Sequence, residues 1–124
     1  MKLIEILNIN LFIDQVKTQP LPFKTSYKLA KTAKAIETEV TFYQSKFREI
    51  VMQYAELDEN GQPVFIDNGA SIKLKEGTEQ ECNEKIIELQ NTEATLEYTP
   101  FTPEEFDSVE LSADVLELAL PLFE

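Results

Sequence analysis

The clearest pattern in the chain is a stripe of apolar residues between positions 29 and 54. Its members recur at alternating steps of four and three residues: Leu29, Ala33, Ile36, Val40, Tyr43, Phe47, Ile50 and Tyr54. This spacing places them on one face of an α-helix. Because no Gly or Pro lies between Pro22 and Gly61, we expect one helix of roughly 30 residues and about 45 Å. Such a helix must lay its apolar face against the rest of the chain or against a partner.

Shorter patterns predict the elements before this helix. The segment Lys2–Leu7 is apolar and β-branched, which favours a short strand, and Leu11–Lys17 could form one or two helical turns. The two prolines of Gln19–Pro22 then break the chain. Thr25 or Ser26 is the expected N-cap of the long helix, and the second of the two prolines is the alternative first helical residue.

Turn and cap signals organise the middle of the chain. Asp58–Gly61 predicts a tight turn, and Val64–Ile66 and Ile72–Leu74 flank a loop of about five residues, which indicates a β-hairpin. Thr78–Glu81 has the form of a capping box and opens a second helix that runs to about Asn91. The apolar stripe of that second helix consists of Cys82, Ile86 and Leu89.

The last third of the chain predicts short elements. Apolar and polar residues alternate over 94–99, which favours a strand, and Thr102–Glu105 caps a single helical turn. Ser112 caps a last short helix, Ala113–Leu120. Together these patterns predict one α+β domain over residues 1–124, with the long helix packed antiparallel on a shorter helix and a small antiparallel sheet of three or four strands.

Charge is distributed unevenly along this chain. The net charge is −12, yet residues 1–52 hold eight Lys and Arg against five Asp and Glu, whereas residues 53–124 hold three against eighteen. Two interpretations are open. Either the acidic segments fold back over the basic start of the long helix, or the acidic surface faces a basic partner. We favour the first, because charged residues usually form solvated faces.

The residue types present exclude several kinds of catalytic site. The sequence contains no histidine, which removes the commonest general base and rules out a Ser-His-Asp or Cys-His site within one chain. Cys82 is the only cysteine and lies on an apolar stripe, so we interpret it as a core residue. Three scattered glycines cannot build a Gly-rich phosphate loop. We therefore expect no enzymatic activity and no cofactor.

A weak metal signal lies just after the long helix. Glu56, Asp58, Asn60 and Asp67 fall at positions 1, 3, 5 and 12 of an EF-hand-like loop. Position 12 is not the bidentate Glu of that motif, and Pro63 interrupts the loop. We favour an ordinary acidic turn and expect no metal site.

The candidate interface combines lysines, aromatics and glutamates that lie off the apolar stripes. Its residues are Lys24, Tyr27, Lys28, Lys31, Phe42, Glu79, Glu81, Glu84 and Glu88. The lysines could grip an anionic group, and the aromatics, with Phe23, could anchor a partner. The alternatives are a solvated or internally covered basic face, packing of the aromatics in the core, and a solvated acidic helix face.

Three segments carry a family resemblance. Residues 21–31 (LPFKTSYKLAK), 53–64 (QYAELDENGQPV) and 109–123 (VELSADVLELALPLF) resemble short proteins of tailed bacteriophages whose function is unknown. The resemblance implies a phage or prophage origin. The sequence itself indicates a cytoplasmic protein, since Glu5 and Asp14 interrupt the apolar N-terminal segment and no signal-peptide cleavage site follows it. With the resemblance, the expected location is the cytoplasm of the bacterial host. Location in the virion is the alternative.

Two functional hypotheses follow. The preferred one is a non-enzymatic phage protein that acts through protein–protein contacts, with a virion or assembly component as its more specific form. The alternative is an acidic inhibitor of a host defence or nucleic-acid enzyme, whose glutamates imitate a polynucleotide. The expected partner is a phage or host protein, and self-association is open. No membrane is expected, because no apolar run approaches the ~20 residues of a membrane span, and the net charge disfavours a nucleic acid.

Overall fold

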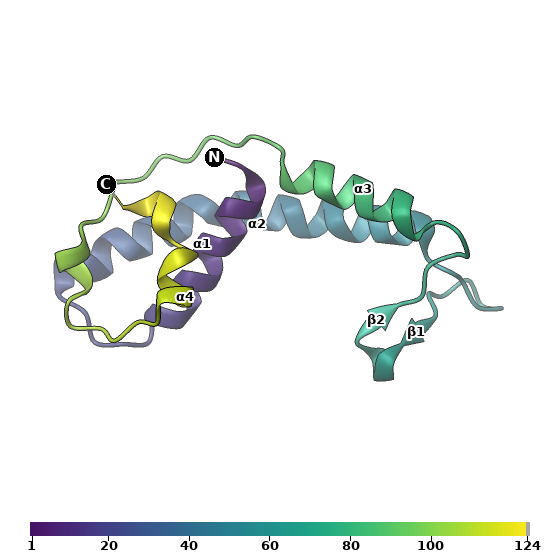
Figure 1. Cartoon of the computed structure of the whole chain (residues 1–124), viewed down its shortest axis with the longest axis horizontal. Coiled ribbons are helices and arrows are strands. Elements are labelled where there is room, and N and C mark those ends of the chain that lie inside the picture. The colour runs from purple at the N-terminus through teal and green to yellow at the C-terminus, as the bar shows by residue number, and fades with distance from the viewer. Residues whose placement is uncertain (124) are drawn as a thin grey trace. The chain divides into compact units, whose positions relative to one another are not determined.

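The computed structural model describes residues 1–123 and consists of two compact units (Figure 1). The first unit comprises Met1–Thr41 and the chain from Thr92 onward, and the second comprises Phe42–Asn91. Helix α2 (Phe23–Tyr54) contributes to both. Helices predominate, and the one sheet of the described residues is small and antiparallel, so the fold belongs to the α+β class, as predicted. The single-domain organisation stays a prediction.

Helix α1 (Leu3–Val16) replaces the strand that the sequence predicted over Lys2–Leu7. The two short elements predicted before the long helix are thus one helix, which extends to Val16. Its buried residues recur at steps of mostly three: Leu3, Ile6, Ile9, Phe12, Ile13 and Val16. A window of six mostly apolar residues fits either a strand or a buried helix. Only the apolar pattern over the whole of Leu3–Val16 distinguishes the helix from a strand. The Glu5 carboxylate, which accepts a hydrogen bond from the Lys2 N–H at 2.9 Å, fixes the start of the helix.

Helix α2 confirms the long helix and most of its predicted face. On the stripe, Leu29, Ile36, Tyr43 and Tyr54 are buried, whereas Phe47 is 39% exposed. Helix α2 packs against α1 in the first unit and antiparallel to α3 (Glu79–Gln90) in the second (Figure 1). No helix within residues 1–123 combines the length and apolar content that a membrane crossing requires.

Thr25 and Ser26 do not cap α2, because the helix already begins at Phe23. The Ser26 N–H donates to the Pro22 carbonyl at 3.0 Å, which is the first helical hydrogen bond. Thr25 is instead 2% exposed, and its hydroxyl donates to the Glu105 carbonyl at 3.2 Å. The prolines therefore set the start of the helix, and Thr25 joins it to the C-terminal segment.

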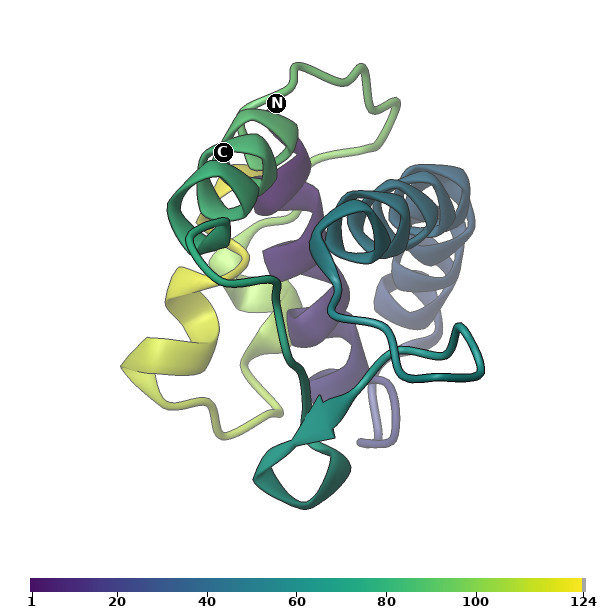
Figure 2. The same cartoon turned by 90° about the vertical axis from the view of Figure 1, so that its right-hand side faces the viewer.

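An aromatic cluster forms the centre of the first unit. Phe106 lies 5.6 Å from Phe12, 5.3 Å from Phe101 and 5.7 Å from Phe123, measured between ring centroids. The cluster joins α1 to η2 (Pro103–Phe106) and to the end of the chain, where the Phe101 N–H donates to the Leu122 carbonyl at 2.9 Å. In this unit α1 lies between the first part of α2 and helix α4 (Figures 1 and 2).

The predicted strand over 94–99 is wrong, because these residues form no regular element. The start of the segment does lie against the N-terminus: the Ala94 N–H donates to the Met1 carbonyl at 2.8 Å, beside a single antiparallel bridge between Lys2 and Glu93. Because the chain becomes a helix at Leu3, this pairing does not extend into a strand. Further along, the Tyr98 hydroxyl donates to the Pro121 carbonyl at 2.8 Å.

The predicted C-terminal caps are confirmed. The Thr102 N–H donates to the Glu105 carboxylate at 2.9 Å, and this capping box opens η2, a single turn. The Ser112 hydroxyl accepts from the Val115 N–H and opens α4 (Ala113–Glu117), which is followed by η3 (Leu120–Leu122). The last helix is therefore shorter than predicted and is continued by a 3₁₀ turn.

The sheet of the second unit is smaller than expected. Strands β1 (Phe65–Ile66) and β2 (Ser71–Ile72) pair antiparallel around η1 (Asp67–Gly69), which confirms the hairpin. There is no third or fourth strand in this described part of the chain. Single bridges from Ala55 to Leu74 and from Leu57 to Pro63 hold the segments on either side of the hairpin.

Helix α3 has the predicted bounds but not the predicted cap. Thr78 has helical dihedral angles, and its hydroxyl donates backward to the Lys75 carbonyl at 2.6 Å. Because an N-cap residue needs an extended backbone to turn its hydroxyl onto the first turn, the capping box cannot form.

Candidate interaction surfaces

Lys28 is not available to a partner, because the C-terminal segment covers it. Its ammonium donates to the Pro100 carbonyl at 2.7 Å and to both Glu105 oxygens at 2.9 and 3.0 Å. It also lies 4.7 Å from the centroid of the Phe101 ring. The acidic second half of the chain therefore does fold back onto the basic start of the long helix at this lysine.

Glu105 completes this contact electrostatically. Burial by itself raises the pKa of its carboxyl group, but the hydrogen bond from the Thr102 N–H, the hydrogen bond and charge of Lys28, and the charge of Lys24 outweigh burial. The pKa of Glu105 is therefore lowered, and the carboxylate is fully ionised at neutral pH.

Three side chains form a ladder on the outer face of α2, opposite its buried face. The rings of Phe23 and Tyr27 are stacked, with centroids 6.2 Å apart and planes 17° apart, and the Lys31 ammonium lies 5.4 Å from the Tyr27 centroid. Phe23 is 84% exposed and Tyr27 56%. We call Phe23, Tyr27, Lys31 and the neighbouring exposed Lys24 the aromatic–lysine ladder. Residues 15–36 carry five lysines and no acidic residue, so the ladder is basic although the chain is acidic.

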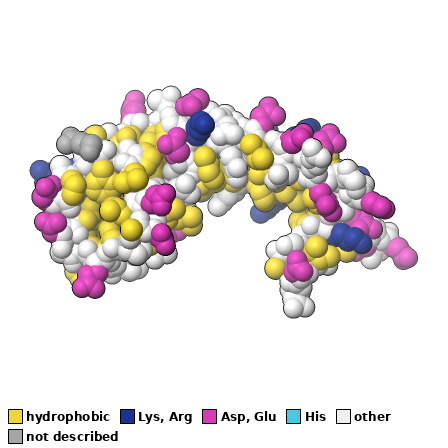
Figure 3. All heavy atoms as spheres, in the orientation of Figure 1, with side chains coloured by type: hydrophobic (Ala, Val, Ile, Leu, Met, Phe, Trp, Pro, Cys, Tyr) yellow, Lys and Arg dark blue, Asp and Glu magenta, His cyan; other side chains and the backbone are white. Residues whose placement is uncertain are grey.

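A second exposed apolar surface lies on α4 and η3, where the sequence analysis proposed none. Leu116 is 38% exposed and Leu120 57%, while Asp114 and Glu117 are exposed beside them. We call these four residues the leucine–carboxylate face. Figure 3 shows hydrophobic side chains gathered over this part of the first unit, with acidic side chains around them.

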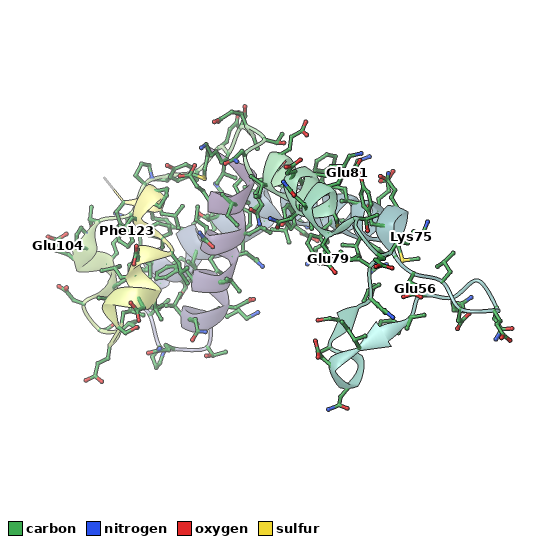
Figure 4. The ribbon with its side chains drawn as sticks, turned by 45° about the vertical axis from the view of Figure 1, so that its right-hand side comes forward. Glu56, Lys75, Glu79, Glu81, Glu104 and Phe123 are labelled. Atoms are coloured by element: carbon green, nitrogen blue, oxygen red, sulfur yellow. The ribbon has the colours of Figure 1, made fainter. Side chains whose placement is uncertain are left out.

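The predicted acidic face of α3 exists, but a lysine divides it. Glu79, Glu81, Glu84 and Glu88 are all exposed, and Figure 4 shows the first two at the start of the helix. Lys85 lies among them, 5.7 Å from the Tyr54 ring centroid. A hydrogen bond with Tyr54 raises the pKa of Lys85, and the charges of Glu81 and Glu88 add to this.

The remaining candidates are separate from the ladder. Phe42 is 45% exposed and belongs to the second unit. In the EF-hand-like segment, Glu56 forms an ion pair with Lys73 at 3.1 Å, and the Asp58 carboxylate accepts backbone hydrogen bonds from Asn60 and Gln62. Within residues 1–123 no three Asp, Glu or Cys side chains are grouped to hold a metal ion.

A cavity of about 530 Å³ lies beside the ladder. It is lined by Lys28, Lys31, Thr32, Lys34, Ala35, Glu97, Tyr98 and Thr99. Its charges are balanced, because Lys28 pairs with Glu105, Lys34 pairs with Glu37 at 3.5 Å, and Glu97 faces the same space as Lys31. The cavity therefore offers an anion no net attraction.

Comparison of the chain with protein-family models, with curated proteins and with solved structures gave no match. The surfaces themselves are thus the basis for a functional conclusion. Of the two, the ladder exposes aromatic side chains, the residue type that is enriched at protein interfaces.

Proposed function

We propose that this chain is a non-enzymatic protein that acts by binding another protein through the aromatic–lysine ladder. The observation that carries the proposal is the stacked, exposed pair of Phe23 and Tyr27. Removing apolar surface from water is favourable by about 25 cal/mol for each Å². A partner that covers these two exposed rings therefore gains binding free energy. Tyrosine is also among the residue types most enriched at the energetic hot spots of protein interfaces.

The fold does not require this pair. Phe23 touches water over most of its surface, and helix α2 is anchored by buried residues such as Leu29 and Ile36 on its other side. The pair is nevertheless held in one geometry by the helix and by the stacking of the two rings. Such preorganisation favours binding, because little side-chain entropy remains to be lost.

The more specific proposal is a phage-encoded virion or assembly component, present in the bacterial host cytoplasm or in the particle. It is supported by the resemblance of residues 21–31, 53–64 and 109–123 to short phage proteins. The first of these three segments contains the aromatic pair of the ladder.

The alternative, an acidic inhibitor that imitates a polynucleotide, has weaker support. From Glu79 to Glu88, helix α3 rises about 14 Å. A DNA duplex presents about eight phosphates over that length, whereas α3 presents four glutamates and one opposing Lys85. The charge density is therefore less than half that of the duplex.

The experiment that tests the proposal compares partner capture by three forms of the protein. The wild type, the double variant Phe23→Ala/Tyr27→Ala and a matched control, Phe65→Ala, are immobilised and exposed to an extract of the cells in which the protein is naturally made. Phe65 is 56% exposed but lies in β1, in the second unit. We expect the double variant alone to lose a specific partner; equal capture by all three would contradict the proposal.

A further inference from the structure

We infer that the partner of the ladder is a second copy of this chain, which docks its leucine–carboxylate face on it. This inference rests on the proposed function and adds the identity of the partner. The two surfaces carry opposite charges, since Lys24 and Lys31 are exposed on the helix of the aromatic pair whereas Asp114 and Glu117 are exposed in the segment that carries the two leucines. Apolar area meets apolar area at the centre, and opposite charges meet at the rim.

The ladder and the leucine–carboxylate face cannot meet within one molecule. In the first unit α1 lies between α4 and the first part of α2 (Figure 2). The ladder is on the side of α2 that faces away from α1, because Tyr27 is exposed while Leu29 and Ile36 are buried. The leucines are likewise exposed members of the segment formed by α4 and η3, whereas Ala119, between the two elements, and Leu122, in η3, are buried. Each copy thus presents both surfaces outward, the ladder and the leucine–carboxylate face.

Such an arrangement gives a head-to-tail contact. Two different patches pair, so each bound copy leaves one patch unoccupied at either end, and the chain can grow into a ring or a filament. This property suits an assembly component, since growth follows from the same contact repeated.

The contact is expected to be weak and dependent on concentration. The two rings expose roughly 300 Å² together, well below the ~800 Å² per partner of a standard stable interface. Two copies with a charge of −12 each also repel one another at long range. At 0.15 M salt, where the Debye length is about 8 Å, that repulsion is screened more than the contact pairs.

The test is light scattering on purified protein at 0.15 M salt over a concentration series up to about 1 mM. Wild-type protein is expected to gain average mass continuously as concentration rises. Tyr27→Asp, which blocks the ladder, and Leu120→Asp, which blocks the leucine–carboxylate face, are each expected to stay monomeric. An equimolar mixture of the two variants keeps one intact face of each kind, so it should form a dimer that does not grow further.

Charge reversal gives an independent arm. Lys31→Glu should weaken self-association at least tenfold, and the double variant Lys31→Glu/Glu117→Lys should recover most of it. All altered residues are exposed, and equal melting temperatures would establish that the variants are folded.

Wild-type protein that stays monomeric throughout, or a single blocked variant that still grows, would overturn the inference. Neither result decides the proposed function, whose own test is the loss of specific partner capture by the Phe23/Tyr27 double variant, whatever protein that partner is.

Discussion

The ammonium of Lys28 lies 2.9 Å from the carboxylate of Glu105, and only 14% and 16% of the two side chains are exposed. The pair joins the start of α2 to η2 across 77 residues of chain. Thr25 makes a second link from the same helix to the Glu105 carbonyl. The contact accounts for one lysine of the basic segment, which is held inside the first unit by the acidic half of the chain.

We expect Lys28→Met to lower the free energy of unfolding by about 2–3 kcal/mol, because it leaves the largely buried Glu105 carboxylate without its counter-charge. Removing both charges in Lys28→Met/Glu105→Gln should recover part of this loss. Urea unfolding measures both. The matched control is Lys34→Met, whose pair with Glu37 is 85% and 65% exposed and should change stability by less than about 0.5 kcal/mol. Equal effects at positions 28 and 34 would contradict the account.

The lowered pKa of Glu105 predicts a defined pH dependence. At about pH 5.5 and above, more than one unit above the ordinary glutamate pKa of about 4.3, the carboxylate is ionised in both states and its contribution to stability is complete. As the pH falls further, the unfolded chain binds the proton first, and the contribution disappears as the pH passes the lower pKa of the folded protein. The stability difference between wild type and Glu105→Gln should therefore shrink between pH 5 and 3.

This measurement calls for dilute protein, because the isoelectric point is about 4.4. Urea midpoints at pH 7, 5, 4 and 3 suffice for the comparison. A difference between wild type and Glu105→Gln that does not change with pH would show that the ion pair contributes nothing to folding.

Phe106 should be the most sensitive position of the aromatic cluster. It is 5% exposed and its ring contacts those of Phe12, Phe101 and Phe123. Phe106→Ala should cost about 3–5 kcal/mol through lost burial and a cavity, a large share of the 5–15 kcal/mol typical of a whole domain. Phe23→Ala removes a ring of the same size from an 84% exposed site and should leave the melting temperature nearly unchanged. Similar losses at both positions would contradict the assignment of core and surface.

The hairpin tip should respond oppositely to two substitutions. Asp67, Asn68 and Gly69 all have positive φ, at 54°, 58° and 88°. A residue with a Cβ pays roughly 1 kcal/mol for this conformation, so Gly69→Ala should destabilise the second unit by about that amount. Asp67→Gly should relieve strain and be neutral or slightly stabilising. Hydrogen exchange of the β1 and β2 amides would report both changes, and destabilisation by Asp67→Gly would argue for a role of its carboxylate.

Local sequence signals predicted the elements that are determined locally. The long helix, the hairpin and the caps at Thr102 and Ser112 each depend on residues within a few positions of one another. The strand predicted over Lys2–Leu7 failed because six residues cannot separate a period of two from one of three or four. The predicted strand over 94–99 was wrong in consequence, since a strand forms only against a partner strand, which can lie anywhere in the chain.

The candidate site was predictable in part. Tyr27 and Lys31 were identified because they lie off the apolar stripe, and both are exposed. Lys28 could not be separated from them, because its partners Pro100 and Glu105 lie 72 and 77 residues away. The leucine–carboxylate face was missed for a related reason: which side of a short helix is covered depends on how it packs on α1, and the sequence does not encode this locally.

The most direct test of the central claim is site-specific crosslinking from the ladder. A photoreactive phenylalanine analogue replaces Tyr27 in one variant and the exposed Gln53 in a control variant, and both are irradiated in the cells that naturally make the protein. We expect a discrete crosslinked protein from position 27, with peptides of Leu116–Leu120 if the partner is a second copy, and none from position 53. The absence of a crosslink at position 27, or the same products from both positions, would contradict the assignment of the ladder as the binding surface.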